Sequence, residues 1–286
     1  MGKTKIYFPG AYDMDSQTMT SLYRPLLSAS HASIEIVDDV QDCDYIVIQD
    51  QYNEPLPPEK KVLFFQKEPA HIHRYHFTGP NECLQVSHED RAMIQTPWIS
   101  LSHDELIELD YVEKTEKLSV VESGRCSYPG HINRLNAVQD VCKHVADIHI
   151  YGHITRGTEN VGPFKTSLPN RAKESAFLPY KYALAIENGQ TPHYFSEKIV
   201  DPLLCWTTPI YWGCSNIGKY FPKGSYLEIK DLKGNVGEQV AAIIEGTHHE
   251  DNIEALAEAR DLILNKYNLI PTIESVIKKG KMKWAE

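Results

Sequence analysis

The stretch YFSEKIVDPLLCWTTPIYWG, residues 194–213, decides how the rest of the chain is interpreted. It begins with an aromatic ring, a hydroxyl, a carboxylate and an ammonium group close together, at Tyr194, Ser196, Glu197 and Lys198. An apolar run interrupted by Pro202 follows, and a β-rich segment closes the stretch at 208–212. This order predicts a helix that begins near Ser196 and leads into a strand.

The start of that helix is a candidate anion site. The first turn of a helix has free backbone N–H groups and the positive end of the helix dipole, and Ser196 is a suitable N-cap. Lys198 places a cation in this turn, where the dipole disfavours one, which indicates that Lys198 binds an anion such as phosphate. Glu197 suits the dipole, so its simpler interpretation is a stabilising acid. Pro202 removes one helical hydrogen bond or marks a short first turn.

Strands and helices alternate along the whole chain. The expected strands are 5–8, 33–37, 45–49, 62–65, 118–123, 147–152, 182–186, 208–212 and 226–229. Further helices are expected at 16–30, at 132–145 with Ile132 on the apolar face, at 235–245 and at 251–265, while the acidic stretch within 89–117 is interpreted as a linker. Such alternation is typical of parallel sheets with crossover helices. We therefore predict an α/β protein of two halves with the ligand site in a cleft between them.

Composition and charge narrow the class of protein. Hydrophobic residues make up 42% and charged residues 24%, as in soluble globular proteins. The formal net charge of -10 argues against a nucleic-acid partner, because nucleic-acid footprints are basic. No apolar run reaches the roughly 20 residues of a membrane span, and the N-terminus lacks the apolar core of a signal peptide. The six cysteines form no CxxC pair, so we expect a soluble, cytoplasmic protein with reduced thiols and no anchor.

A longer segment around the opening stretch resembles a known family. The sequence IENGQTPHYFSEKIVDPLLCWTTPIYWG, residues 186–213, is similar to the donor-binding motif of the α-1,3-fucosyltransferases, glycosyltransferase family ten. That motif is Phe-Glu-Asn, a variable gap, Tyr-x-Thr-Glu-Lys, an apolar helix and a Pro-Ile/Val-x-x-Gly strand. The matching residues are Glu187, Asn188, Tyr194, Glu197, Lys198, Pro209 and Gly213. The departures are Ile186 for the aromatic residue and Ser196 for threonine, and the first 115 residues match poorly.

The resemblance implies a fold and a reaction. The fold is GT-B, in which two Rossmann-like domains face a cleft, and it assigns residues 1–115 to the acceptor side and 116–286 to the donor side. The last helix could also pack back on the N-terminal domain. The reaction is an inverting single displacement that needs no metal and no bound cofactor. Its most direct form moves fucose from GDP-fucose to a hydroxyl of a glycan or glycoprotein acceptor.

The resemblance also implies roles for the residues of the motif. Lys198 neutralises the leaving diphosphate, and Asn188 and Tyr194 contact the nucleoside or the ribose. Glu197 lies near the donor sugar and favours the positive charge that develops at its anomeric carbon. Glu187 and Ser196 belong to the same donor-binding group.

A second cation is expected, because a diphosphate leaving group carries more than one charge. Arg156, in YGHITRG after a strand, resembles the family arginine upstream of the motif. The simpler interpretation of Arg156 is a solvated loop arginine. Arg125 and Arg134 are alternatives, and Arg134 could instead lie on the exposed face of its helix.

An inverting transferase also needs a base for the acceptor hydroxyl. The family has a glutamate after a strand of the N-terminal domain, and Glu68 follows VLFFQK in this way. The carboxyl ends of strands face the ligand in open α/β sheets. The alternative for Glu68 is a turn residue fixed by Pro69. Asp50 and Glu54, which also follow a strand, are the competing carboxylates.

Two motifs suggest a metal but are weak. Asp42-Cys43-Asp44 has the DxD pattern of metal-dependent transferases, yet it precedes a strand, whereas a working DxD follows one. The histidines of HIHRYH could bind zinc, but surface or acceptor-lining histidines are commoner. We therefore expect no metal site, and we place His71 and His73 on the acceptor side.

Two rival functions stay open. The same scaffold could use another donor, such as UDP-xylose, because the motif fixes the diphosphate contacts better than the base or the sugar. The chain could also be an inactive protein that binds glycans or nucleotide sugars. A soluble chain of this kind fits a bacterial or viral form of the family.

Overall fold

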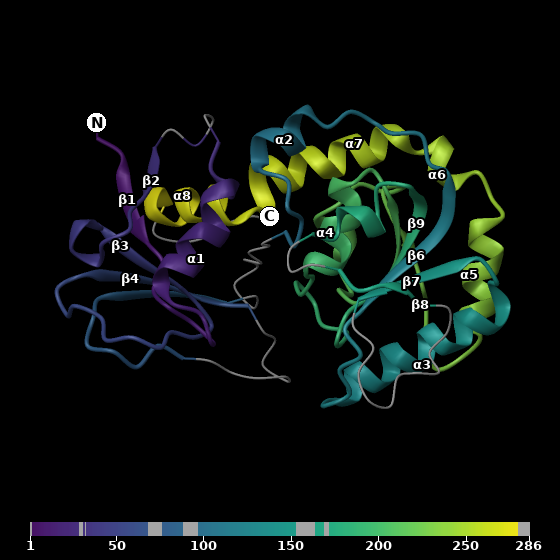
Figure 1. Cartoon of the computed structure of the whole chain (residues 1–286), viewed down its shortest axis with the longest axis horizontal. Coiled ribbons are helices and arrows are strands. Elements are labelled where there is room, and N and C mark those ends of the chain that lie inside the picture. The colour runs from purple at the N-terminus through teal and green to yellow at the C-terminus, as the bar shows by residue number, and fades with distance from the viewer. Residues whose placement is uncertain are drawn as a thin grey trace. The chain divides into compact units, whose positions relative to one another are not determined.

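The structure is a computed structural model that describes residues 2–28, 31, 33–67, 76–87, 97–152, 164–168 and 172–279 (Figure 1). The chain divides into two compact units. The N-terminal unit contains Met1–Ile94, Ser102–Glu108 and Asn265–Glu286, and the C-terminal unit contains Gln95–Leu101 and Leu109–Leu264. Each unit has its own parallel sheet, so the predicted α/β class with two parallel sheets is confirmed.

The sheet of the N-terminal unit has the order β2-β1-β3-β4-β5. Its strands are β1 (Thr4–Tyr7), β2 (Ile34–Ile36), β3 (Tyr45–Gln49), β4 (Lys61–Gln66) and β5 (Cys83–Ser87). The described helices of this unit are α1 (Ser16–Tyr23), α2 (His103–Glu108) and α8 (Leu269–Lys279). All pairs are parallel, and the strand order reverses between β1 and β3.

Both faces of this sheet are covered, which explains its nearly continuous apolar strands. Along β3 and β4, Val47, Leu63 and Phe65 belong to one buried cluster, and Ile46 and Phe64 belong to the cluster on the opposite face. Apolar residues of α8 complete the first cluster, namely Leu269, Ile270, Ile273 and Val276. The end of the chain therefore contributes to the core of the unit that begins it.

The sheet of the C-terminal unit has the order β11-β10-β9-β6-β7-β8, again with all pairs parallel. Its strands are β6 (Glu116–Glu122), β7 (Ile148–Gly152), β8 (Phe164–Thr166), β9 (Tyr180–Ile186), β10 (Thr208–Trp212) and β11 (Leu227–Glu228). Numbered along the chain from β6, they lie in the order 3-2-1-4-5-6 of doubly wound folds, and the order reverses between β6 and β9.

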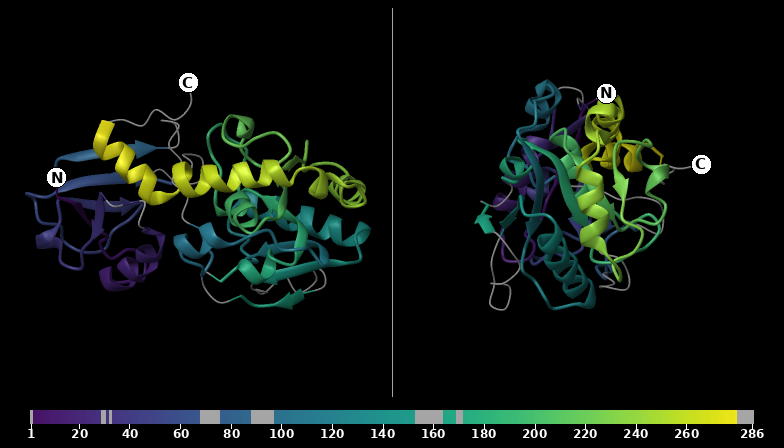
Figure 2. Two further views of the ribbon diagram at one scale, coloured as in Figure 1. Left: turned by 90° about the horizontal axis from the view of Figure 1, so that it is seen from above. Right: turned by 90° about the vertical axis from the view of Figure 1, so that its right-hand side faces the viewer.

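Helices cover this second sheet as well. They are α3 (Pro129–His144), α4 (Glu197–Leu204), α5 (Val236–Ile244), α6 (His248–Asp251) and α7 (Ile253–Leu262). The helices α3 and α5 lie side by side (Figures 1 and 2), and their apolar residues share a core with β6, β7, β9 and β10. The helix α4 packs against β9 and β10, and four of its apolar side chains are fully buried, namely Ile199, Val200, Leu203 and Leu204.

The opening stretch folds as its sequence predicts. The helix α4 begins at Glu197, the side chain of Ser196 accepts a hydrogen bond from the backbone N–H of Lys198, and Pro202 lies inside the helix. The strand β10 then covers the expected residues 208–212. Ser196 is the predicted N-cap, and it fixes where the helix starts.

Several helix boundaries differ from the prediction for identifiable reasons. The first helix ends at Tyr23, because Pro25 turns the chain into a short 3₁₀ segment, Arg24–Leu26. The helix α3 begins earlier than expected, with a proline in its first turn, and Ile132 is 48% exposed rather than part of the apolar face. The expected linker contains α2, and the helix expected at 251–265 is split between α6, α7 and a π-helical turn, Ile263–Tyr267.

Among the described residues, no helix has the length and apolar character that crossing a bilayer requires.

Candidate functional site

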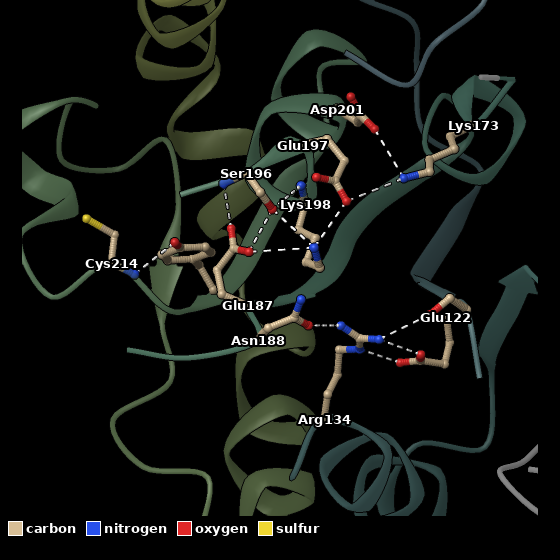
Figure 3. A network of polar contacts seen from close by, with 12 residues as sticks. Glu122, Arg134, Lys173, Glu187, Asn188, Ser196, Glu197, Lys198, Asp201 and Cys214 are labelled. Atoms are coloured by element: carbon tan, nitrogen blue, oxygen red, sulfur yellow. Dashed lines mark hydrogen bonds and ion pairs between the residues drawn. The ribbon is translucent and has the colours of Figure 1, made fainter. Parts of the chain in front are cut away.

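Charged residues gather where the strand order of the C-terminal unit reverses (Figure 3). The strand β6 ends at Glu122, and β9 is followed directly by Glu187 and Asn188. The helix α3 follows β6, and α4 follows β9 after a loop. Doubly wound sheets bind their ligands at this reversal point, outside the carboxyl ends of the strands. The candidate site therefore lies where this type of sheet is expected to bind a ligand.

Glu187 contacts both Ser196 and Lys198 at the start of α4. Its carboxylate is fully buried and accepts hydrogen bonds from the backbone N–H of Ser196 at 2.7 Å and from the Ser196 hydroxyl at 2.6 Å. The Lys198 ammonium lies 3.7 Å from Oε2 of the same carboxylate, the oxygen that also accepts from the Ser196 hydroxyl. Burial raises the pKa of Glu187, and Lys198 opposes that rise. Glu187 thus fixes both the cap of α4 and the cation in its first turn.

Lys198 is held as a cation at the helix N-terminus. Its Nζ lies 3.1 Å from Glu197 Oε1 and 3.2 Å from the Ser196 hydroxyl. Burial lowers the pKa of Lys198, but the carboxylates of Glu197 and Glu187 outweigh burial and leave the pKa above its ordinary value. The unfavourable interaction with the helix dipole is thus offset by two carboxylates.

A second buried network connects α3 to the carboxyl ends of β6 and β9. Arg134 of α3 donates to both carboxylate oxygens of Glu122, at 2.7 and 2.8 Å, and to Oδ1 of Asn188 at 2.6 Å. Arg134 is 6% exposed, so the interpretation of this residue as decoration on an exposed helix face is wrong. The error follows from the misplaced start of α3, which put Ile132 inside. The bidentate pair fixes the orientation of Asn188.

Two glycines permit the close approach of the chain segments at the site. A Cβ atom on Gly130, in the first turn of α3, would lie 1.8 Å from the backbone oxygen of Asn188. A Cβ atom on Gly213, just after β10, would lie 2.3 Å from Cγ of Glu187. Both positions therefore require glycine for steric reasons, because no side chain fits beside the neighbouring backbone or carboxylate.

The remaining residues of the motif lie close by. Tyr194 is 3% exposed, and the neighbouring Phe195 is fully buried against the rings of Tyr220 and Phe221. His193 has a positive φ of 65°, and its ring pairs with the hydroxyl of Tyr220 at 2.6 Å. The loop between β9 and α4 is thus packed tightly before the helix begins.

Sequence reasoning did not identify three charged residues of this site. Glu122 had a usable signal, since it is the charged last residue of a buried strand followed by a serine and a glycine. The sequence around Lys173 and Asp201 contains no signal that indicates their role. In the structure, Lys173 Nζ lies 3.6 Å from Asp201 Oδ2 and 3.9 Å from Glu197 Oε1. Their pairing depends on folding that the local sequence does not indicate.

Several predicted residues lie outside the described residues, so the structure does not place them. These are Glu68, Arg156, His71 and His73. Of the competing carboxylates, Asp50 accepts a hydrogen bond from the backbone N–H of Lys67 at 2.7 Å, and Glu54 accepts one from the Tyr7 hydroxyl at 2.7 Å.

The DxD pattern lies away from the strand ends at which ligands bind. Asp42 and Asp44 precede β3, and Asp44 accepts a hydrogen bond from the backbone N–H of Lys5 at 2.8 Å. Within the described ranges, no cluster of three or more His, Cys, Asp or Glu side chains could hold a metal ion.

A family model matches the part of the chain that carries this site. Residues 111–249 match the model of the glycosyltransferase family 10 (fucosyltransferase) C-terminal domain. The matched segment includes every residue of the charged networks described above. The predicted resemblance to the α-1,3-fucosyltransferases is thereby confirmed for this segment.

Curated relatives are similar over shorter segments. An α-(1,3)-fucosyltransferase of Helicobacter pylori is 41% identical over 65 residues, which are 22% of this chain and 14% of that protein. A GDP-fucose protein O-fucosyltransferase 3 of Xenopus tropicalis is 29% identical over 109 residues, 37% of this chain and 22% of that protein. The matched segments thus span less than a quarter of these relatives' lengths.

Solved structures share the fold over nearly the whole chain. An α1,3-fucosyltransferase structure has a TM-score of 0.51 at 16% identity, covering 94% of this chain and 93% of that one. A DNA-modifying β-glucosyltransferase has a TM-score of 0.59 at 10% identity, covering 96% of this chain and 98% of that one. These similarities confirm the predicted GT-B fold class, and they concern the fold alone.

Proposed function

We propose that this chain, whose residues 111–249 form a glycosyltransferase family 10 domain, transfers fucose from GDP-fucose to a hydroxyl of a glycan acceptor. The observation that carries the proposal is the buried arrangement of Glu187, Ser196 and Lys198 at the start of α4. It presents a fixed cation at the N-terminus of α4, beside the strand ends where a nucleotide binds. The acceptor is a glycan, free or attached to a protein.

The diphosphate of the donor binds at the N-terminus of α4. The negative charge of the leaving diphosphate is stabilised by Lys198, whose raised pKa keeps it cationic, and by the positive end of the α4 dipole. Because these groups are fixed before the reaction, they stabilise the departing diphosphate without a metal ion. Lys198 is then the main countercharge of the leaving group.

The other residues of the site divide into contacting and positioning groups. Asn188, held by Arg134, and Tyr194 contact the nucleoside or the ribose. Glu197 stabilises positive charge at the anomeric carbon of the sugar. Glu187 is fully buried, so we assign it the role of positioning Ser196 and Lys198 rather than touching the donor.

The reaction is a single displacement. The acceptor oxygen attacks the anomeric carbon on the face opposite GDP, the bond from that carbon to the diphosphate breaks, and the configuration inverts. The acceptor proton passes to a general base of the N-terminal unit, for which Glu68 is our candidate. His71 and His73, close to Glu68 in the sequence, are assigned to the acceptor side.

A transfer assay with purified protein tests this function. GDP-fucose is incubated with a panel of galactose- and N-acetylglucosamine-containing acceptors in EDTA, and GDP release and the anomeric configuration of the product are measured. We expect acceptor-dependent GDP release that EDTA does not reduce, and a product of inverted configuration. Transfer from UDP-xylose instead would contradict the donor assignment. GDP binding without any transfer would favour an inactive binding protein.

A further inference from the structure

Lys173 joins two carboxylates of α4 from outside the helix. Its Nζ lies 3.9 Å from Glu197 Oε1 and 3.6 Å from Asp201 Oδ2 (Figure 3). Glu197 and Asp201 are four residues apart, so both carboxylates lie on the same face of the helix. Lys173 itself precedes the 3₁₀ segment Glu174–Ala176, which leads into β9. The lysine thus connects the segment before β9 to the helix after it.

The surroundings of Lys173 limit its movement. Its side chain is 18% exposed, and the ring of Trp98 lies 5.3 Å from its Nζ in a cation–π contact. Asp201 is fully buried and accepts a hydrogen bond from the backbone N–H of Trp98 at 2.9 Å. Ser100 donates to Glu174 through both its backbone N–H and its hydroxyl, at 3.1 and 2.5 Å. The ammonium is therefore held between Asp201, Trp98 and Glu197.

Glu197 has two lysine neighbours, Lys198 and Lys173, which differ in their other contacts. Lys198, at 3.1 Å, also contacts Glu187 and Ser196, and it faces the proposed diphosphate position. Lys173, at 3.9 Å, is anchored by a buried carboxylate and faces Glu197 from the opposite side (Figure 3). A bound diphosphate would draw Lys198 toward its oxygens. Lys173 then remains as the cation that holds the Glu197 carboxylate in place.

We propose that Lys173 is a positioning residue that holds Glu197 for the reaction while Lys198 is engaged by the donor phosphates. The inference rests on the proposed function, because it takes Glu197 to act on the donor sugar. Lys173 touches neither donor nor acceptor in this account. Its removal should therefore affect turnover much more than donor binding.

The variant Lys173→Met tests this role through the separation of kcat from binding. We expect kcat to fall by about 30- to 100-fold, because a catalytic group misplaced by about 1 Å loses on that order of rate. The Kd for GDP should change less than about threefold, since the groups at the α4 N-terminus are unaltered. Lys173→Arg should restore most of the rate. Lys117→Met, which removes an exposed lysine paired with Glu245, is the matched control and should leave kcat unchanged.

The pH profile of kcat gives a readout that a structural role would not change. Among the described residues, the charged groups near Glu197 include Lys173, Lys198, Arg134, Glu187 and Asp201. Loss of a cation near a carboxylate makes that carboxylate harder to ionise. The acidic limb of the profile should therefore move to higher pH in Lys173→Met and return in Lys173→Arg.

A double variant separates positioning from folding. Lys173→Met leaves the buried Asp201 carboxylate without this cation and should lower the melting temperature. Adding Asp201→Asn removes that buried charge while keeping an oxygen for the N–H of Trp98, so the melting temperature should recover. We expect kcat to stay low in the double variant. Recovery of kcat together with stability, or an unshifted pH profile in Lys173→Met, would overturn the inference.

The activity of the wild-type protein distinguishes a failure of the proposed role of Lys173 from a failure of the proposed function. If the wild type transfers fucose and Lys173→Met is equally active, the positioning role alone is wrong. If the wild type binds GDP but transfers no sugar to any acceptor, the proposed function fails, and the role of Lys173 fails with it.

Discussion

The two parallel sheets of this protein reverse their strand order at one point each, and they differ in what lies there. In the C-terminal unit, between β6 and β9, the buried residues Glu122, Arg134 and Glu187 form charged networks. In the N-terminal unit, just beyond β3, the described contacts of Asp50 and Glu54 are with a backbone N–H and a phenol. Similar scaffolds thus carry different chemistry at equivalent positions.

This difference indicates which unit binds the charged substrate. Burying an ion pair is often neutral or destabilising compared with apolar packing, so buried pairs at a strand end are better explained by function than by stability. We propose that the networks of the C-terminal unit provide fixed charges for a nucleoside diphosphate, and that the N-terminal unit supplies the base and the acceptor contacts.

The largest expected effect would come from the N-terminal unit. Glu68→Gln should lower kcat by about 10²- to 10⁴-fold, the usual contribution of a general base, with the Kd for GDP unchanged. Asp50→Asn and Glu54→Gln are the matched controls, and each should lower kcat less than about tenfold. The kcat of each variant is measured from the rate of GDP release at a saturating concentration of GDP-fucose. An inactive Asp50 or Glu54 variant beside an active Glu68→Gln would reassign the base.

The next effect concerns the buried pair of Arg134 and Glu122. Arg134→Met leaves the Glu122 carboxylate buried without its cation, which should reduce the free energy of unfolding by about 3 to 5 kcal/mol. Urea denaturation measures this loss. Adding Glu122→Gln should restore stability but not GDP affinity, because Asn188 stays without its partner. Restored GDP affinity in the double variant would show that the network is only structural.

Buried His249 allows the two ends of the C-terminal sheet to be compared. It lies near the amino ends of β9 and β10, whereas the charged networks lie at the carboxyl ends. Burial lowers its pKa to about 4. The unfolded state, with a pKa near 6.5, therefore binds more protons between pH 6.5 and 4, and stability falls as the pH falls through this window. The loss should approach about 3 kcal/mol at pH 4.

Urea midpoints between pH 7 and 4 check this effect. His249→Gln should flatten the pH dependence, whereas His144→Gln, at an exposed position on α3, should leave it unchanged. Equal pH dependence in wild type and His249→Gln would contradict the assignment.

The smallest effect concerns the close packing at the reversal point. Gly130→Ala places a Cβ 1.8 Å from the backbone oxygen of Asn188, so α3 must shift at a cost of about 1 to 3 kcal/mol. Gly234→Ala is the control, because a Cβ there meets nothing within 4 Å. Thermal melting compares the two, and similar melting temperatures would contradict the close packing of Asn188 against α3.

The sequence predicted the fold class and the α4 region well, because the signals there are local. Ser196 caps its helix, and β10 has the predicted limits. The alternation of strands and helices predicted parallel sheets with crossover helices, and both sheets are parallel. The boundaries of α1 and α3 were misplaced where a proline ended or began a helix.

The network residues were harder to predict, because their partners are distant in the sequence. Arg134 contacts Asn188 across 54 positions, and Trp98 contacts Asp201 across 103. No periodicity within α3 indicates that Arg134 faces inward, since its neighbours Ile132 and Leu135 are both apolar and only Leu135 is buried. Such pairings follow from the strand order, which the sequence pattern alone does not specify.

The most direct test of the account is calorimetric titration of GDP in EDTA into the wild type and Lys198→Met. Removing one partner of a buried charge arrangement typically weakens binding by about 2 to 5 kcal/mol, so we expect Lys198→Met to weaken GDP binding by about 30- to 5000-fold. Lys181→Met, at an exposed lysine paired with Glu250, should bind GDP like the wild type. Equal GDP affinity in the wild type and Lys198→Met would contradict the placement of the donor diphosphate at the start of α4.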